Sequence, residues 1–177
     1  GIYRHFSTIA DTCDIPIVLY NVPGRTGVGI AAETVARLVK NRNVLGVKEA
    51  AGSVERVSEI LSLCDTSIMC GDDSLTVPMM LLGAKGVISV ASNIIPAELK
   101  KMTDACASGD FMTAVAMHRK YWRLFKDLFV ESNPIPVKAA MAMLGMIEEE
   151  YRLPLCPLSD VNREKLRKTV SECIRSV

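Results

Sequence analysis

The chain has 177 residues, of which 49% are apolar and 23% are charged, and its formal net charge is +1. This composition predicts a globular protein with a substantial core, and it excludes a broad basic surface of the kind that binds nucleic acid. Six cysteines without a CxxC pair and only two histidines make a zinc site unexpected, so we predict free thiols in a reducing cytoplasm.

Helical and strand-like periodicities alternate along the first 90 residues. Helices are predicted at 2–13, 31–40, 53–63 and 73–83, the last with Asp73 as its N-cap, and strands are predicted at 15–23, 44–50, 67–71 and 86–90. From Pro96 onward only helices are predicted, at 96–107, at 110–131, from Pro134 or Pro136, and at 159–175.

Strands that are apolar on both faces and are separated by helices indicate a parallel sheet in an α/β protein. A complete (βα)8 TIM barrel takes about 250 residues, and four strands cannot close one. We therefore predict a partial TIM barrel in residues 1–95. The last barrel helix and a C-terminal helical domain would follow in residues 96–177.

No membrane span or secretion signal is expected. The most apolar window, residues 77–96, is interrupted by Lys85, two prolines and two glycines. The chain opens with GIYRHF, which has neither the basic region nor the cleavage pattern of a signal peptide. It also lacks an initiator methionine, so we expect the sequence to start inside something longer and to be cytoplasmic.

Active sites of such barrels gather at the carboxyl ends of the strands. Tyr20 and Asn21 end the first predicted strand, and Lys48 and Glu49 end the second. A lysine that follows the apolar run Val44 to Val47 would place its amine in a partly dry cavity, which disfavours the ammonium and suits Schiff-base chemistry. A lysine that snorkels to solvent fits this position equally well.

Tyr20 favours the catalytic interpretation, because a phenol beside the lysine could pass protons to and from a carbinolamine. Beyond it, the loop 22–29 carries Arg25, whose guanidinium suits a carboxylate, although a solvated loop arginine is the commoner case. The segment 27–32 also fits the dinucleotide pattern GxGxxA, but Pro23 separates it from the strand. No cofactor is therefore expected.

Other polar residues have structural explanations. Asp72 and Asp73 resemble a carboxylate pair for a metal, yet directly before a helix they more often cap its free amides. His118 lies on the apolar side of its helix with Val115 and Trp122, which favours packing in the core or against another subunit.

Five segments resemble, in order, the dihydrodipicolinate synthase family: YNVPGRTG (20–27), GVKEAAG (46–52), GDD (71–73), GVISV (86–90) and FVESNPIPVKAAM (129–141). The resemblance implies a class I aldolase-type lyase of lysine and diaminopimelate biosynthesis. Such an enzyme condenses pyruvate with aspartate 4-semialdehyde through a lysine imine and acts as a homo-oligomer, a dimer or tetramer. It also implies that the partial barrel is the C-terminal half of the family's TIM barrel.

The resemblance assigns roles to individual residues. Lys48 would form the Schiff base and Tyr20 would relay protons. Arg25 would hold the carboxylate of the semialdehyde, Ile88 would contact pyruvate through its main chain, and Gly71 would line the same pocket. N-acetylneuraminate lyase and the 2-keto-3-deoxy-sugar-acid aldolases remain alternatives, and Arg25 is the residue that separates the synthase from the lyase.

The resemblance also implies that the chain begins in the family's fourth helix. The first four βα units of the family supply hydroxyl groups for pyruvate, a second tyrosine and the lysine feedback site. Without these groups the pyruvate carboxylate loses fixed donors, so we expect little or no synthase activity from these 177 residues alone. A half-barrel that self-associates and performs no chemistry is the non-enzyme alternative.

Overall fold

The computed structural model describes residues 1–174, and the chain divides into two compact units. The first unit is Gly1–Ile88 and the second begins at Ser89. The predicted division after residue 95, between barrel and helical domain, stays a prediction.

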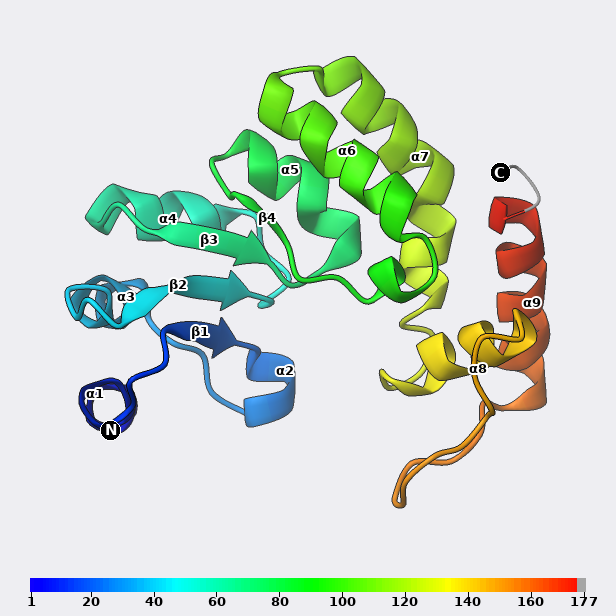
Figure 1. Ribbon diagram of the computed structural model, residues 1–177, viewed down its shortest axis with the longest axis horizontal. Coiled ribbons are helices and arrows are strands. Elements are labelled where there is room, and N and C mark those ends of the chain that lie inside the picture. Colours follow the sequence, from blue (N-terminus) through cyan, green and yellow to red (C-terminus); the bar gives the residue numbers. More distant parts are fainter. Residues whose placement is uncertain (175–177) are drawn as a thin grey trace. The chain divides into compact units, whose positions relative to one another are not determined.

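The first unit is a four-stranded parallel sheet with helices between its strands (Figure 1). The strands are β1 (Ile17–Asn21), β2 (Val44–Glu49), β3 (Ser67–Cys70) and β4 (Gly86–Val87), and they pair in the order β1-β2-β3-β4. The helices are α1 (Ile2–Thr12), α2 (Pro23–Thr26), α3 (Ala32–Leu38), α4 (Glu55–Leu63), the 3-10 helix η1 (Asp73–Leu75) and α5 (Thr76–Leu81). The predicted parallel βα pattern is confirmed.

The two faces of the sheet have different surroundings. Leu19, Val47 and Ile68 lie opposite one another in the parallel register, and all three are fully buried. They share a core with side chains of α3, α4 and α5 such as Val35 and Ile60. Because side chains alternate along a strand, the neighbours of these residues project from the other face of the sheet.

The predicted helix 73–83 and strand 86–90 differ from the structure. The helix is split into η1 and α5. Asp73 is the first residue of η1 and Asp72 occupies the N-cap position, so the prediction of Asp73 as N-cap was wrong. Pro78 has no N–H to bond a carbonyl four residues back, so α5 can begin only within one turn of it. The strand is shorter because β4 pairs only with β3 and the backbone is already helical at Val90 (φ −85°, ψ −43°).

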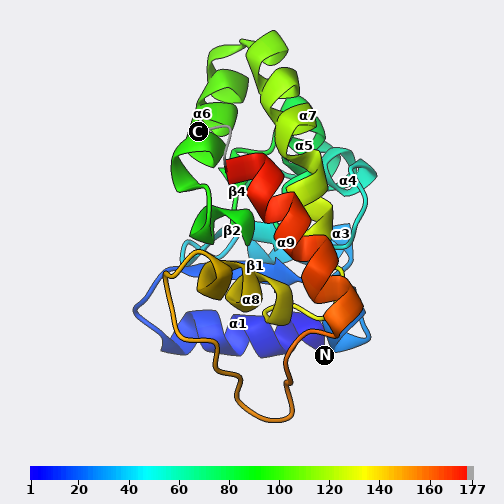
Figure 2. The same cartoon turned by 90° about the vertical axis from the view of Figure 1, so that its right-hand side faces the viewer.

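The second unit is helical. It contains the 3-10 helix η2 (Ala91–Asn93), α6 (Pro96–Ser108), α7 (Phe111–Asp127), α8 (Ile135–Met143) and α9 (Asp160–Ile174). Helices α6 and α7 lie side by side, and α9 packs against α7 and α8 (Figure 2). Gly109 ends α6 with φ 82°, as predicted from its position. Residue 175, the last of the predicted helix 159–175, lies outside the described residues.

Helix α7 (Phe111–Asp127) is shorter than the predicted 110–131, and its most buried side is not the one that carries Val115, His118 and Trp122. Asp110 caps it by accepting a hydrogen bond from the Thr113 N–H at 3.1 Å. The side chains that α7 buries most are Ala114, Tyr121, Leu124, Phe125 and Asp127, whereas Phe111 and Trp122 remain about half exposed. His118 is half-buried near the Phe125 ring, and burial, followed by the charge of Arg119, lowers its pKa.

Three further findings concern the described part of the chain. None of its helices is long and apolar enough to cross a membrane. Residues 1–174 contain no group of three or more His, Cys, Asp or Glu side chains that could hold a metal ion. All six cysteines are free thiols, as predicted.

Candidate active site

Lys48 and Tyr20 lie next to each other at the carboxyl ends of β2 and β1. The two residues are direct partners in the parallel register, so their side chains project from the same face of the sheet. The Lys48 side-chain nitrogen Nζ lies 4.2 Å from the centroid of the Tyr20 ring. The lysine is half-buried, and the tyrosine is 43% exposed. This contact places an amine and a phenol where one small carbonyl compound could meet both.

Gly71 supplies the space through which the Lys48 side chain passes. Its N–H donates to the main-chain oxygen of Glu49 at 2.8 Å, which continues the ladder between β2 and β3. A Cβ at position 71 would lie only 3.1 Å from Lys48 Cε and 2.6 Å from Ala50 Cβ. The residue therefore lies against the predicted nucleophile, and the missing side chain matters for packing as well as for lining the site.

Ile88 lies directly after β4 and extends the same edge. Its N–H donates to the Cys70 carbonyl at 2.9 Å, and its side chain is 44% exposed. Since the N–H is already used by the sheet, the carbonyl is the main-chain group of Ile88 that could meet a ligand. The structure thus brings Tyr20, Lys48, Gly71 and Ile88 to the carboxyl ends of four successive strands.

Arg25 lies on α2, directly beyond β1, and is exposed. The sequence predicted a loop here, whereas the structure has a short helix with Pro23 in its first turn and Gly27 (φ 72°) at its end. The first glycine of the GxGxxA pattern therefore follows a helix and not a strand. The dinucleotide fingerprint requires a strand, turn and helix in that order, and this segment differs from it.

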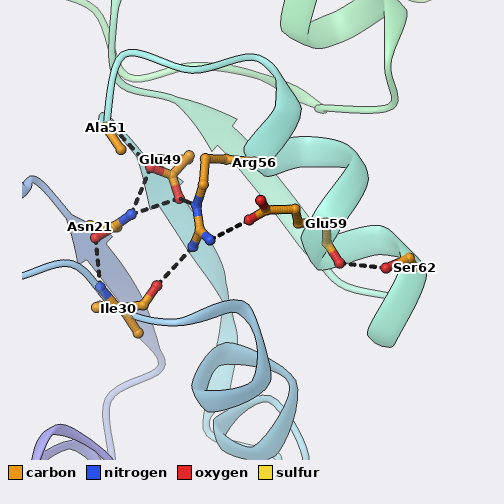
Figure 3. A network of polar contacts seen from close by, with 7 residues as sticks. All are labelled: Asn21, Ile30, Glu49, Ala51, Arg56, Glu59 and Ser62. Carbon is orange, nitrogen blue, oxygen red and sulfur yellow. Dashed lines mark hydrogen bonds and ion pairs between the residues drawn. The ribbon is translucent and has the colours of Figure 1, made fainter.

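Behind the site, Asn21 and Glu49 form a polar network that the sequence did not predict (Figure 3). Both residues end predicted strands, but their side chains point to the helix-covered side of the sheet, where both are almost completely buried. Asn21 Nδ2 donates to both Glu49 carboxylate oxygens at 2.7 and 2.8 Å. Arg56 of α4 joins from the other side, with Nε 3.4 Å from Glu49 Oε2. The feature of the sequence that could have indicated this network is the carboxylate of Glu49 directly after the strand lysine.

Cys70 and Asp72 lie at the end of β3. The Cys70 thiol donates to the Asp72 carbonyl at 3.1 Å, and burial raises its pKa to about 12. Asp72 precedes η1 but makes no side-chain capping bond there, so the predicted capping role of this aspartate was wrong. The short segment folds on its own main chain, because the Leu75 N–H donates to the Asp72 carbonyl at 2.8 Å.

The chain matches the model of the dihydrodipicolinate synthetase family over residues 1–173. Among curated relatives, it is 49% identical over 174 residues to the 4-hydroxy-tetrahydrodipicolinate synthase of Geobacter metallireducens, which covers 97% of this chain and 60% of that relative. The synthase of the same name from Sulfurihydrogenibium sp. is 53% identical over 174 residues, covering 96% of this chain and 59% of the relative.

Solved structures give the same result. The 4-hydroxy-tetrahydrodipicolinate synthase of Methylacidiphilum fumariolicum SolV superposes with a TM-score of 0.97 at 47% identity, over 99% of this chain and 59% of that one. The dihydrodipicolinate synthase of Aquifex aeolicus superposes with a TM-score of 0.95 at 48% identity, over 97% of this chain and 60% of that one. These likenesses confirm the predicted C-terminal half of a TIM barrel followed by helices. The chain spans about 60% of the length of the relatives it matches, and it belongs to the dihydrodipicolinate synthetase family.

Proposed function

We propose that these residues form the Schiff-base half of a synthase that condenses pyruvate with aspartate 4-semialdehyde to 4-hydroxy-tetrahydrodipicolinate, in lysine and diaminopimelate biosynthesis. Relatives about half identical to the chain carry the name of that synthase. The observation that carries the proposal is the contact between Lys48 and Tyr20, with Nζ 4.2 Å from the ring centroid at the edge of the sheet where barrel enzymes perform chemistry.

The proposed reaction begins with attack of the Lys48 amine on the keto carbon of pyruvate. The resulting carbinolamine loses water to give an imine, which draws electrons from the neighbouring methyl carbon. Loss of a proton from that carbon gives an enamine, and the enamine attacks the aldehyde of the second substrate. Because pyruvate itself forms the covalent intermediate, the proposal involves no cofactor or metal ion.

Tyr20 is proposed to move the protons that carbinolamine formation and breakdown require. A phenol can donate and accept a proton at the same oxygen, and the 43% exposure of the side chain leaves it accessible to a bound substrate. Positioned proton transfer of this kind contributes roughly 10²- to 10⁴-fold to enzymatic rates.

The remaining site residues are proposed to bind substrate. Arg25 would pair with the carboxylate of the semialdehyde, for which the planar guanidinium offers two parallel donors. The Ile88 carbonyl would contact pyruvate, and Gly71 would leave room for the lysine. The proposal includes a cytoplasmic homo-oligomer with small-molecule substrates, without nucleic acid or membrane partners. A monomeric variant of a dihydrodipicolinate synthase is among the similar structures.

We further propose that the 177 residues by themselves turn over slowly. Fixed donors for the pyruvate carboxylate contribute to binding and orientation, and the groups expected to supply them belong to the part of the relatives that this chain does not match. Imine formation is therefore the better assay, because reduction traps each imine irreversibly and accumulates even a weakly bound substrate.

The test is reductive trapping with pyruvate and cyanoborohydride, followed by peptide mapping. Label is expected on Lys48, and Lys48→Arg should abolish it. The matched control is Lys85→Arg, because Lys85 is an exposed lysine on the neighbouring part of the same unit and should not affect labelling. Label distributed over surface lysines, or none at Lys48, would contradict the proposal.

A second experiment separates the synthase from aldolases that act on other aldehydes. The trapped amount should fall when aspartate 4-semialdehyde is added before the reductant, since the enamine is consumed. Arg25→Ala should reduce this effect about tenfold or more while leaving imine formation with pyruvate nearly unchanged. An equal response to N-acetylmannosamine would favour the lyase instead.

A further inference from the structure

The network behind the sheet is directly coupled to the proposed catalytic pair through the main chain. Asn21 follows Tyr20, Glu49 follows Lys48, and both pairs lie in the same register of β1 and β2. Successive residues of a strand project to opposite faces. Whatever fixes the Asn21 and Glu49 side chains on the covered face therefore also fixes the backbone from which the phenol and the amine leave on the other face.

The network holds its carboxylate tightly. Glu49 has no exposed surface, and a buried carboxylate is costly unless donors surround it. Besides the two bonds from Asn21 Nδ2, Glu49 Oε1 accepts from the Ala51 N–H at 2.9 Å. Arg56 Nε lies 3.4 Å from Glu49 Oε2. Donors thus come from β1, from the segment after β2 and from α4, and they converge on one group.

The same network reaches the segment that carries Arg25. The Asn21 Oδ1 atom accepts a hydrogen bond from the Ile30 N–H at 2.9 Å, and Arg56 Nη2 donates to the Ile30 carbonyl at 2.7 Å (Figure 3). Ile30 is therefore held through both of its main-chain polar groups. Residues 22–29 are fixed at one end by β1 and at the other by these two hydrogen bonds to Ile30. Arg25 lies between the two fixed ends.

We propose that Asn21, Glu49 and Arg56 are positioning residues, which set the Tyr20–Lys48 contact through the two strands and the Arg25 segment through Ile30. The inference rests on the proposed function, because it assigns these residues to the geometry of imine formation and of semialdehyde binding. They touch neither reacting atom. Their effect is transmitted by the backbone, and a misplacement of about 1 Å at a reacting group costs roughly a hundredfold in rate.

The strand part of the inference is tested with Glu49→Gln. Glutamine keeps the shape but faces the amide of Asn21 and the guanidinium of Arg56 with an additional donor. Pyruvate trapping at Lys48 is expected to become about ten to a hundred times slower. The rate is measured well below the melting temperature of the variant, where circular dichroism reports a folded protein. The matched control is Glu59→Gln, which neutralises the other, half-exposed carboxylate beside Arg56 (2.6 Å from Nη1) without touching Glu49 or Ile30.

The segment part is tested with Arg56→Met, which keeps the apolar stem and leaves the Asn21–Glu49 bonds in place. Hydrogen–deuterium exchange of the peptide 22–31 is expected to be about tenfold faster, and trapping several times slower. Arg56→Lys keeps a cation and can bond one partner, so it should restore part of the slow hydrogen exchange and part of the trapping rate. Glu59→Gln should change neither.

The outcomes separate the inference from the proposed function. If the unmodified chain is not labelled at Lys48, the proposed function fails. If the unmodified chain is labelled, the inference is overturned when folded Glu49→Gln and Arg56→Met both trap pyruvate at the unmodified rate and show unchanged hydrogen exchange in residues 22–31. The proposed function then still stands. A lower melting temperature with unchanged trapping would show a structural role only. If Glu49→Gln does not fold, Arg56→Met decides by the same two measurements.

Discussion

Gly71→Ala is expected to damage the proposed active site through one methyl group. The backbone of Gly71 has no positive φ, so alanine can adopt the same conformation. The obstacle is space. The new Cβ would lie 2.6 Å from Ala50 Cβ, 3.1 Å from Lys48 Cε and 3.2 Å from the Glu49 carbonyl oxygen.

The size of the effect follows from these distances. Carbon atoms in van der Waals contact are about 3.5–4.0 Å apart, so the contact with Ala50 is too short by roughly 1 Å. The Ala50 methyl cannot rotate away, because it is attached directly to the main chain after β2. Either the strand end or the Lys48 side chain must move. Overpacking of this kind costs about 1–3 kcal/mol of stability, and displacement of the amine by about 1 Å should slow imine formation roughly a hundredfold.

The assay combines reductive trapping of pyruvate with thermal unfolding. Gly86→Ala is the matched control, because it makes the same change on the neighbouring part of the sheet. Its Cβ would meet only the end of the Met69 side chain, with Cε at 3.1 Å and the sulfur at 3.9 Å, and a methionine side chain can turn aside. If Gly71→Ala traps pyruvate as fast as the unmodified chain and melts at the same temperature, the steric reasoning is refuted.

Three further changes have defined outcomes. Tyr20→Phe keeps the ring beside Lys48 but removes the phenolic proton, so trapping should slow about a hundredfold or more, and an unchanged rate would exclude proton relay. Because burial raises the pKa of the Cys70 thiol to about 12, iodoacetamide at pH 8 should alkylate exposed Cys13 more than tenfold faster, as read by peptide mapping. Hydrogen bonds from Arg163 lower the pKa of Glu149. The stability from this pair should therefore be complete above the carboxyl's ordinary pKa and lost as the pH falls through the lowered one, whereas Glu149→Gln should show no such loss in urea titrations.

The periodicity of the sequence was sufficient to predict the elements of the fold that depend on burial. β1 and β2 lie inside the predicted runs 15–23 and 44–50, because each has a row of side chains in the core. The predictions failed where a local feature decides. Pro78 delays α5, and β4 is shortened because it pairs only with β3. Neither effect changes the apolar periodicity, so neither could be seen in it.

The site was predictable to the extent that strand ends determine it. Parallel strands bring their carboxyl ends to one edge, and this rule alone predicted that Tyr20 and Lys48 would meet, as their register shows. The support behind them was not predictable. It requires Arg56, on a helix that follows, and Ile30, in a connecting segment, to converge on one buried carboxylate. No spacing in the sequence encodes that convergence, because it depends on how the helix packs on the sheet.

The alternation of β2 explains why a charged side chain can follow the proposed nucleophile directly. A shift of the strand by one residue would move Lys48 onto the helix-covered face and Glu49 onto the open one. The amine would then be buried among the side chains of α3 and α4, and the donors of Asn21 and Arg56 would face no acceptor. Both losses oppose the shift. The buried carboxylate therefore specifies the register in which the amine reaches the open face of the sheet.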